Sequence, residues 1–163
     1  MFYLIILIIF STNFLKTQAV ICYRAEQMRT MSCQNSVFQL CETYGIQKAC
    51  DYQLRRPTSW RRGVSVQEAC KKNQPPGRYT AIGTFLRENE EYPFTNRYPH
   101  FQPHSALFLA CGAWNSIIVL DQHTDNRTFS VWGTNVLMDR GNDVSEYNSR
   151  MYYTIEESHR RYN

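Results

Sequence analysis

Cys33 and His104 are the residues of this 163-residue chain whose types and sequence settings best suit covalent catalysis. A thiol becomes an effective nucleophile when a base takes its proton and the surroundings stabilise the thiolate. Cys33 precedes a stretch with helical periodicity, so it is predicted to lie in a first helical turn, where backbone N–H groups and the helix dipole favour an anion. His104 opens the apolar run at residues 105–109 and supplies the base. The pair predicts hydrolytic chemistry through a thiolate.

Asp121 is the third member of this candidate set because it ends a second apolar run, residues 117–120. If the two runs form a hairpin, His104 and Asp121 lie at the same end of neighbouring antiparallel strands. A carboxylate there orients the imidazole, and backbone N–H groups at the helix start stabilise the oxyanion. We therefore predict Cys33 as nucleophile, His104 as base and Asp121 as the residue that orients it.

One helix is expected ahead of the strands that carry these residues. Val37, Leu40, Cys41 and Tyr44 recur at spacings of three and four residues, and Gly45 is placed to end the helix. Proline and glycine then punctuate a polar stretch that contains a short element at residues 64–69.

The rest of the chain has the pattern of strands separated by turns and one long surface loop. The loop is expected over residues 87–102, and strands over residues 79–86, 105–110, 117–120, 128–132 and 151–155. One helix followed by a run of strands predicts an α+β fold with an antiparallel sheet.

The N-terminus has the features of a secretory signal peptide. Residues 1–14 are almost continuously apolar, and residues 17–19 place small residues where signal peptidase cuts. We expect residues 1–19 to be removed, although a cut after Cys22 is also compatible with the sequence. Residues 20–163 then form one secreted domain, because no later apolar run reaches the roughly 18 residues that a membrane span needs.

Cysteine usage agrees with an oxidising compartment but leaves the pairing open. The six cysteines are Cys22, Cys33, Cys41, Cys50, Cys70 and Cys111. Three disulfides account for all six, whereas a free Cys33 leaves an odd number unless the signal is cut after Cys22.

Charge and motif content indicate which partners to expect. The formal net charge of +4 favours anionic surfaces, but the basic residues are scattered and form no patch with interleaved aromatics that would indicate nucleic acid. Metal-ligand spacings and phosphate-binding glycine loops are absent from the sequence, so we expect no metal and no cofactor.

Several segments occur in an order that resembles a known family. They are residues 58–63 (TSWRRG), 75–77 (PPG), 80–85 (TAIGTF), 97–99 (RYP), 104–109 (HSALFL) and 119–122 (VLDQ). The series resembles a small bacterial cysteine-amidase-like family related to NlpC-type and CHAP peptidoglycan hydrolases, of the papain-like superfamily, and to interbacterial amidase effectors. The resemblance covers most of the mature chain, from about residue 33 to residue 155.

The resemblance implies a papain-like NlpC-type fold, in which an N-terminal helix bearing the cysteine packs on an antiparallel sheet bearing the histidine. It makes His104 the base, Asp121 its partner and Gln122 an alternative partner or oxyanion contributor. Cys33 fits the nucleophile because Val37 follows four residues later, whereas Cys41 has Gly45 at that position. The implied substrate is the peptide part of bacterial peptidoglycan.

Three other residues are singled out by the sequence. Trp60 is read first as a core or loop anchor and, beside two arginines, as a residue of the substrate cleft together with Tyr98. Asn126 begins an N-R-T glycosylation acceptor sequence in an exported chain.

The leading hypothesis is a secreted cysteine amidase or peptidase that cleaves amide bonds in bacterial cell-wall peptides. The alternative is a catalytically inactive, disulfide-rich secreted relative that binds wall fragments or a protein partner. A free, reactive Cys33 thiol favours the first hypothesis, and full pairing of the cysteines favours the second.

Overall fold

The computed structural model describes residues 19–30, 32–33, 38–86, 91–93, 103–126, 129–143, 145 and 147–157. Side chains are described for these residues except 28–30, 32–33, 38–42, 122–126 and 129–132. The predicted signal peptide before residue 19 and most of the predicted loop at 87–102, including Tyr98, lie outside the described residues.

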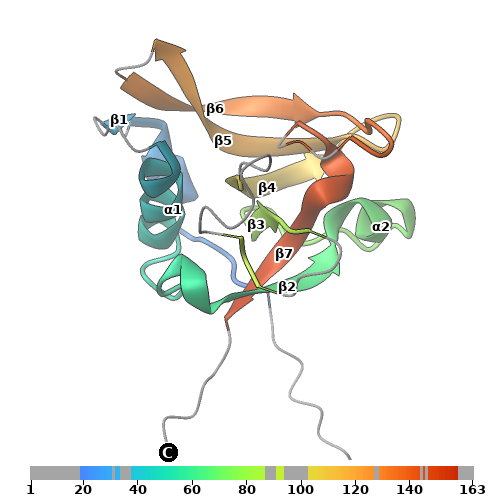
Figure 1. Cartoon of the computed structure of the whole chain (residues 1–163), viewed down its shortest axis with the longest axis horizontal. Coiled ribbons are helices and arrows are strands. Elements are labelled where there is room, and N and C mark those ends of the chain that lie inside the picture. Colours follow the sequence, from blue (N-terminus) through green and yellow to red (C-terminus); the bar gives the residue numbers. More distant parts are fainter. Residues whose placement is uncertain are drawn as a thin grey trace, which may run out of the picture.

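Strands dominate the described part of the chain (Figure 1). The strands are β1 (Ser32–Cys33), β2 (Trp60–Ser65), β3 (Ala81–Thr84), β4 (Ser105–Cys111), β5 (Ile117–Asn126), β6 (Phe129–Leu137) and β7 (Tyr152–Glu157). The α-helices are α1 (Phe38–Ala49) and α2 (Val66–Lys71), and the short 3₁₀ turns are η1 (Ala25–Thr30), η2 (Pro57–Ser59) and η3 (Ser149–Met151).

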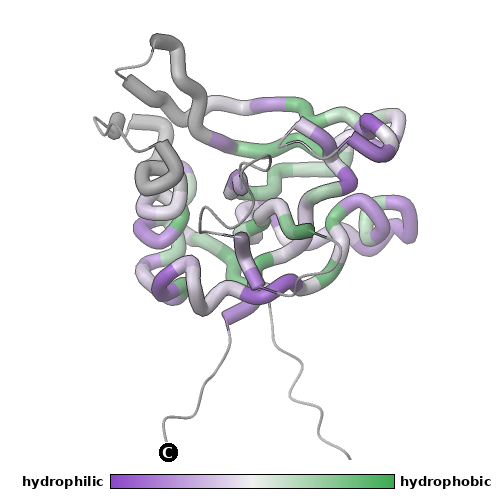
Figure 2. Tube along the Cα trace, viewed as in Figure 1, coloured by the Kyte–Doolittle hydropathy of each residue, from purple (hydrophilic) through white to green (hydrophobic). Residues whose placement is uncertain are grey.

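All seven strands belong to one antiparallel sheet in the order β1-β6-β5-β4-β3-β7-β2. This confirms the predicted α+β class with an antiparallel sheet. Hydrophobic residues concentrate in the strands, and hydrophilic residues follow the outer turns of α2 (Figure 2).

The hairpin of β4 and β5 forms as predicted. Leu107 pairs with Leu120 and Phe108 with Val119, and the turn contains Trp114 and Asn115, both with positive φ. The second strand is longer than the apolar run that predicted it, because its polar half continues to pair with β6 as far as Asn126. Asp121 therefore lies within β5 and not at its end.

Alternate residues of the hairpin pack into two different cores. Leu107 and Leu120 share a buried cluster with Ile46 of α1, whereas Phe108 and Val119 share one with α2. Because neighbouring residues of a strand point to opposite faces, the two helices cover opposite faces of the sheet, as Figure 1 shows. The sheet is buried on both sides at its centre.

The first helix extends beyond its predicted end. Gly45 was expected to terminate it, but α1 runs on to Ala49, and Gly45 is buried inside the helix. Ile46 and Ala49, which follow this glycine, are at most 1% exposed and pack into the core. Burial of this face outweighs the roughly 1 kcal/mol that a glycine costs inside a helix.

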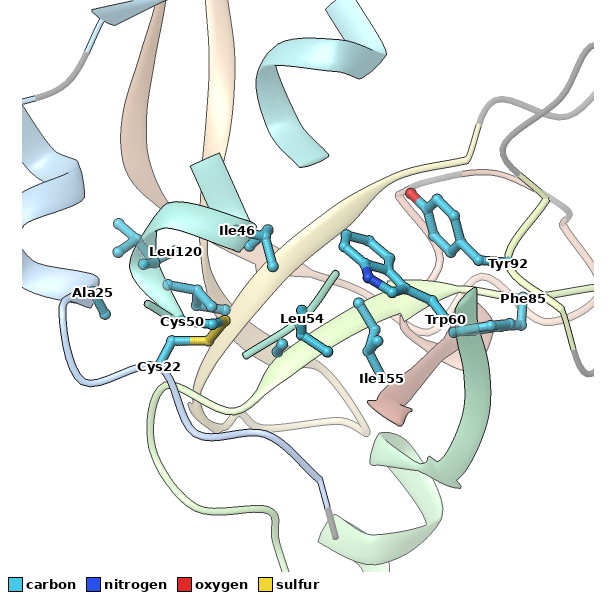
Figure 3. Close-up of a cluster of buried hydrophobic side chains, with 13 residues drawn as sticks. Cys22, Ala25, Ile46, Cys50, Leu54, Trp60, Phe85, Tyr92, Leu120 and Ile155 are labelled. Atoms are coloured by element: carbon cyan, nitrogen blue, oxygen red, sulfur yellow. A yellow bond between two sulfur atoms is a disulfide. The ribbon is translucent and has the colours of Figure 1, made fainter. Parts of the chain in front are cut away.

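The structure corrects the assignment of Trp60 to a substrate cleft. Its side chain is 0% exposed, and its ring lies 5.0 Å from that of Tyr92 in an edge-on arrangement (Figure 3). Trp60 begins β2, which pairs with β7, so the neighbouring arginines lie on a strand and not on a cleft loop. Trp60 is a core residue.

We expect Trp60→Ala to lower the free energy of unfolding by about 3 to 5 kcal/mol, because it removes a fully buried aromatic side chain and leaves a cavity. Trp114→Ala is the matched control, since Trp114 is 86% exposed and its loss should change stability by no more than about 0.5 kcal/mol. Denaturant titration of the two variants measures the difference. Equal stability losses would contradict the assignment of Trp60 to the core.

Among the residues that the structure describes, no helix is both long and apolar enough to cross a membrane.

Candidate active site

His104 and Asp121 form a close, buried pair on one face of the sheet. The distance from His104 Nε2 to Asp121 Oδ2 is 3.2 Å, and the two residues are 8% and 3% exposed. Continuing the β4–β5 register from the Leu107–Leu120 pair places Asp121 opposite Ala106, so His104 and Asp121 are diagonal neighbours on the same face. The contact that the sequence predicted between these two side chains is present.

Neighbouring strands hold His104 in place through both its backbone and its imidazole ring. The N–H of His104 donates to Thr84 Oγ1 at 2.8 Å, and the N–H of Thr84 donates to the His104 carbonyl at 2.9 Å. The ring of Tyr152 lies edge-on to the imidazole at 6.3 Å between centroids. Thr84 and Tyr152 are both 0% exposed, so the histidine packs against fully buried residues.

Asn135 of β6 is a further residue of this cluster, and the sequence did not reveal it. Its Nδ2 donates to both Asp121 oxygens, at 2.9 Å to Oδ1 and 3.0 Å to Oδ2. Asp121 pairs directly with Gly133, and Asn135 lies two residues further along β6 on the same face. The predicted strand ended at Trp132, so Asn135 lay outside it. A period-two extension of that strand was the one signal that could have found Asn135.

The described disulfides reduce the number of cysteines that can act as the nucleophile. Cys22 pairs with Cys50, and Cys70 pairs with Cys111. Every cysteine whose side chain is described is therefore part of a disulfide. The chain has six cysteines, so the remaining two, Cys33 and Cys41, are the candidates for a catalytic thiol.

The backbone places these two cysteines differently. Cys33 lies in β1, before α1 begins at Phe38, so the structure does not confirm a helix that bears this cysteine. Cys33 pairs with Ser130 of β6, which pairs with Thr124, three positions beyond Asp121 on β5. Thus β6 separates Cys33 from the strand that carries Asp121.

Cys41 is the fourth residue of α1, at the end of its first turn. The helix packs against β4, the strand that His104 precedes, and its residue Ile46 shares a core with Leu107. His104 and Asp121 continue the face of Phe108 and Val119, so α1 covers the opposite face of the sheet. A position in the first turn of a helix stabilises a thiolate.

The backbone of β5 places two further predicted site residues, whose side chains are not described. Gln122 follows Asp121 in β5, and Asn126 is the last residue of that strand. Within the described part of the chain, no three His, Cys, Asp or Glu side chains gather in a way that could hold a metal ion.

Comparisons with known proteins identify the family and agree with the fold. The sequence model of the family described as domesticated amidase effector 2 matches residues 8–155. The structure is similar to that of a protein titled type 6 secretion amidase effector 2 (Tae2), with a TM-score of 0.58 and 18% identity over 88% of this chain and 98% of that one. A search of the curated proteins found no match. The chain belongs to the domesticated amidase effector 2 family.

Proposed function

We propose that this protein is a secreted cysteine amidase that hydrolyses amide bonds in the peptides of bacterial peptidoglycan. The observation that carries the proposal is the buried contact of 3.2 Å between His104 and Asp121 in a member of an amidase effector family. A histidine held by a carboxylate is the base that a thiol nucleophile requires.

The reaction follows from the direction in which the imidazole is held. Because Nε2 faces Asp121, Nδ1 is the ring nitrogen that takes the proton of the thiol. The thiolate attacks the amide carbonyl carbon, and Nδ1–H then protonates the leaving amine as the tetrahedral intermediate breaks down to a thioester. A water molecule, deprotonated by the same nitrogen, hydrolyses the thioester and regenerates the thiol. Asp121 stabilises the imidazolium that forms in each half of the reaction.

Cys33 and Cys41 are the two cysteines that the described disulfides leave for the nucleophile. The first turn of α1 favours a thiolate at Cys41, but α1 covers the face of the sheet opposite to His104 and Asp121. Cys33, to which the sequence assigned this role, lies in the edge strand β1 beside β6.

Export to the cell exterior is part of the proposal. Two disulfides in the described residues suit an oxidising compartment, and the apolar residues 1–14 suit a signal peptide. The formal net charge of +4, which becomes 4 − 1 = +3 once the predicted signal peptide with Lys16 is removed, favours contact with an anionic cell wall.

Digestion of purified peptidoglycan by the mature protein tests this function. The wild type should release soluble peptide fragments with new amino groups, and His104→Ala should release them at a rate lower by at least about 10²-fold, because it lacks the general base. Treatment with iodoacetamide should abolish the release if a thiol is the nucleophile. Intact peptidoglycan after incubation with folded wild type would overturn the proposal, and equal digestion by both proteins would remove His104 from the mechanism.

The second candidate function is that of an inactive relative that binds wall fragments or a protein partner. It is favoured by the finding that every cysteine with a described side chain is disulfide-bonded. Counting thiols in the secreted protein without reduction separates the two functions. One rapidly alkylated thiol near neutral pH supports the amidase, and its complete absence supports the binding protein.

A further inference from the structure

We propose that Asn135 is a positioning residue of the active site, which holds the Asp121 carboxylate in the orientation that His104 requires. The inference rests on the proposed function and extends it to a residue on a third strand. The resulting chain of contacts runs from His104, which precedes β4, through Asp121 of β5 to Asn135 of β6.

The geometry shows how Asn135 fixes the carboxylate. A carboxylate with one partner can rotate about its Cβ–Cγ bond, but Nδ2 of Asn135 lies within 3.0 Å of both oxygens and so defines the plane of the group. The bond from Asp121 Oδ2 to His104 Nε2 then has a fixed direction. This determines that Nε2 carries its proton toward Asp121.

The Asn135 amide also supplies the hydrogen bonds that the buried Asp121 carboxylate needs, and it does so without adding a positive charge. Asp121 is 3% exposed, and an ionised carboxylate at that depth needs donors to replace water. Lysine or arginine would supply donors, but their positive charge would oppose the formation of an imidazolium at His104. An asparagine amide donates hydrogen bonds and remains neutral at every pH, so Asp121 keeps its full effect on the imidazole.

The sheet register explains why this position on β6 has the role. The residue directly opposite Asp121 is Gly133, which has no side chain to reach the carboxylate. The diagonal neighbour Asn135 is thus the residue of β6 whose length and donors fit. Leu137, the next residue on the same face, is 3% exposed and packs in the core. Asparagine is disfavoured inside strands, so its presence beside a core position is best explained by its hydrogen bonds to Asp121.

The test compares Asn135→Leu and Asn135→Ala with Thr134→Ala, an exposed neighbour on the same strand. Asn135→Leu keeps the approximate size of the side chain but removes the donor without adding a charge, and Asn135→Ala removes both size and donor. We expect each Asn135 variant to lower kcat by about 10- to 100-fold with KM unchanged, because a hydrogen bond to a charged group is lost and no contact with substrate is. Thr134→Ala should retain wild-type kcat.

Two further measurements separate positioning from a structural role. Alkylation of the catalytic thiol by iodoacetamide at pH 6 should slow by about tenfold in both Asn135 variants, because a misoriented imidazole stabilises less thiolate. In a double-mutant cycle, Asn135→Ala should cause no further loss of kcat in an Asp121→Ala background, because Asn135 acts through that carboxylate.

Distinct results would overturn this inference and the proposed function. Unchanged kcat and unchanged alkylation in Asn135 variants of an active protein would overturn the positioning role, as would independent, additive effects in the cycle. A wild type without amidase activity would overturn the proposed function instead, and the alkylation rates would still decide whether Asn135 positions the base. Thermal unfolding of each variant verifies that the comparison is between folded proteins.

Discussion

Loss of the catalytic thiol is expected to lower amidase kcat/KM by at least about 10³-fold, so one of Cys33→Ala and Cys41→Ala should be inactive and the other should retain activity within about tenfold of wild type. Removing the nucleophile of a covalent mechanism leaves only binding and oxyanion stabilisation, and losses in comparable hydrolases exceed this figure. The prediction follows from elimination among six cysteines, because the other four form the two described disulfides.

The physical difference between the two positions is the backbone around them. In the first turn of α1, N–H groups have no partner within the helix, and they favour both the thiolate and the oxyanion that forms after attack. In β1, an edge strand of two residues, the backbone N–H groups face the neighbouring strand β6 or the open edge. Cys41 therefore has the helix start that Cys33 was expected to have, but α1 covers the face of the sheet opposite to His104 and Asp121.

Rates of amide hydrolysis by the two single variants, with Trp114→Ala as a surface control, decide the assignment. Mass spectrometry after alkylation without reduction should locate the modified thiol at the cysteine whose replacement abolishes activity. If that cysteine is Cys33, the site is formed at the edge of the sheet beside β6. If it is Cys41, the thiol must reach His104 from the other face of the sheet. If both variants lose activity while folded, a bond or contact between the two regions is required for catalysis.

The hairpin that carries the base was predictable because its signals are local. Two apolar runs separated by a short turn segment define β4 and β5, and His104 and Asp121 flank those runs in the sequence. Antiparallel pairing then brings them together with no further information. Their contact is the part of the site that the sequence alone determined.

The features that sequence patterns missed depend on tertiary packing. The helix continues past Gly45 because the residues after it are buried against β4 and β5, an effect that propensity does not contain. Trp60 follows a polar stretch and precedes two arginines, yet pairing of β2 with β7 buries it. Asn135 touches Asp121 through the diagonal register of β5 and β6, which is fixed only once the whole sheet forms.

Replacement of Asp121 by asparagine is expected to lower kcat by about 10²- to 10⁴-fold with little change in stability. The variant keeps the size of the side chain, but the neutral amide no longer stabilises the imidazolium that forms in each half of the reaction. Asn135 Nδ2 donates to both oxygens of Asp121, and in the variant an NH2 group replaces one of them. Two donors then face each other, so at least one of these hydrogen bonds is lost. The orientation of His104 is then no longer unique.

Asp139→Asn provides a matched control, because Asp139 is also an ion-paired carboxylate but contacts Arg150 and not His104. The Arg150 guanidinium, with help from the N–H of Gly141, holds the pKa of the Asp139 carboxyl below its ordinary value. A lowered pKa contributes stability above the unfolded pKa, and this stability is lost as the pH falls through the folded pKa. Asp139→Asn should therefore lower the melting temperature at pH 7 more than at pH 3, and leave kcat unchanged.

The contrast between the two carboxylates separates catalysis from stability. Asp121→Asn should change kcat far more than melting temperature, and Asp139→Asn should do the opposite. A parallel fall of kcat and stability in Asp121→Asn would make Asp121 a structural residue, and the histidine would then need another orienting group. Retention of more than a tenth of wild-type kcat would show that hydrogen bonding by the amide at position 121, without the charge of the carboxylate, is sufficient to direct His104.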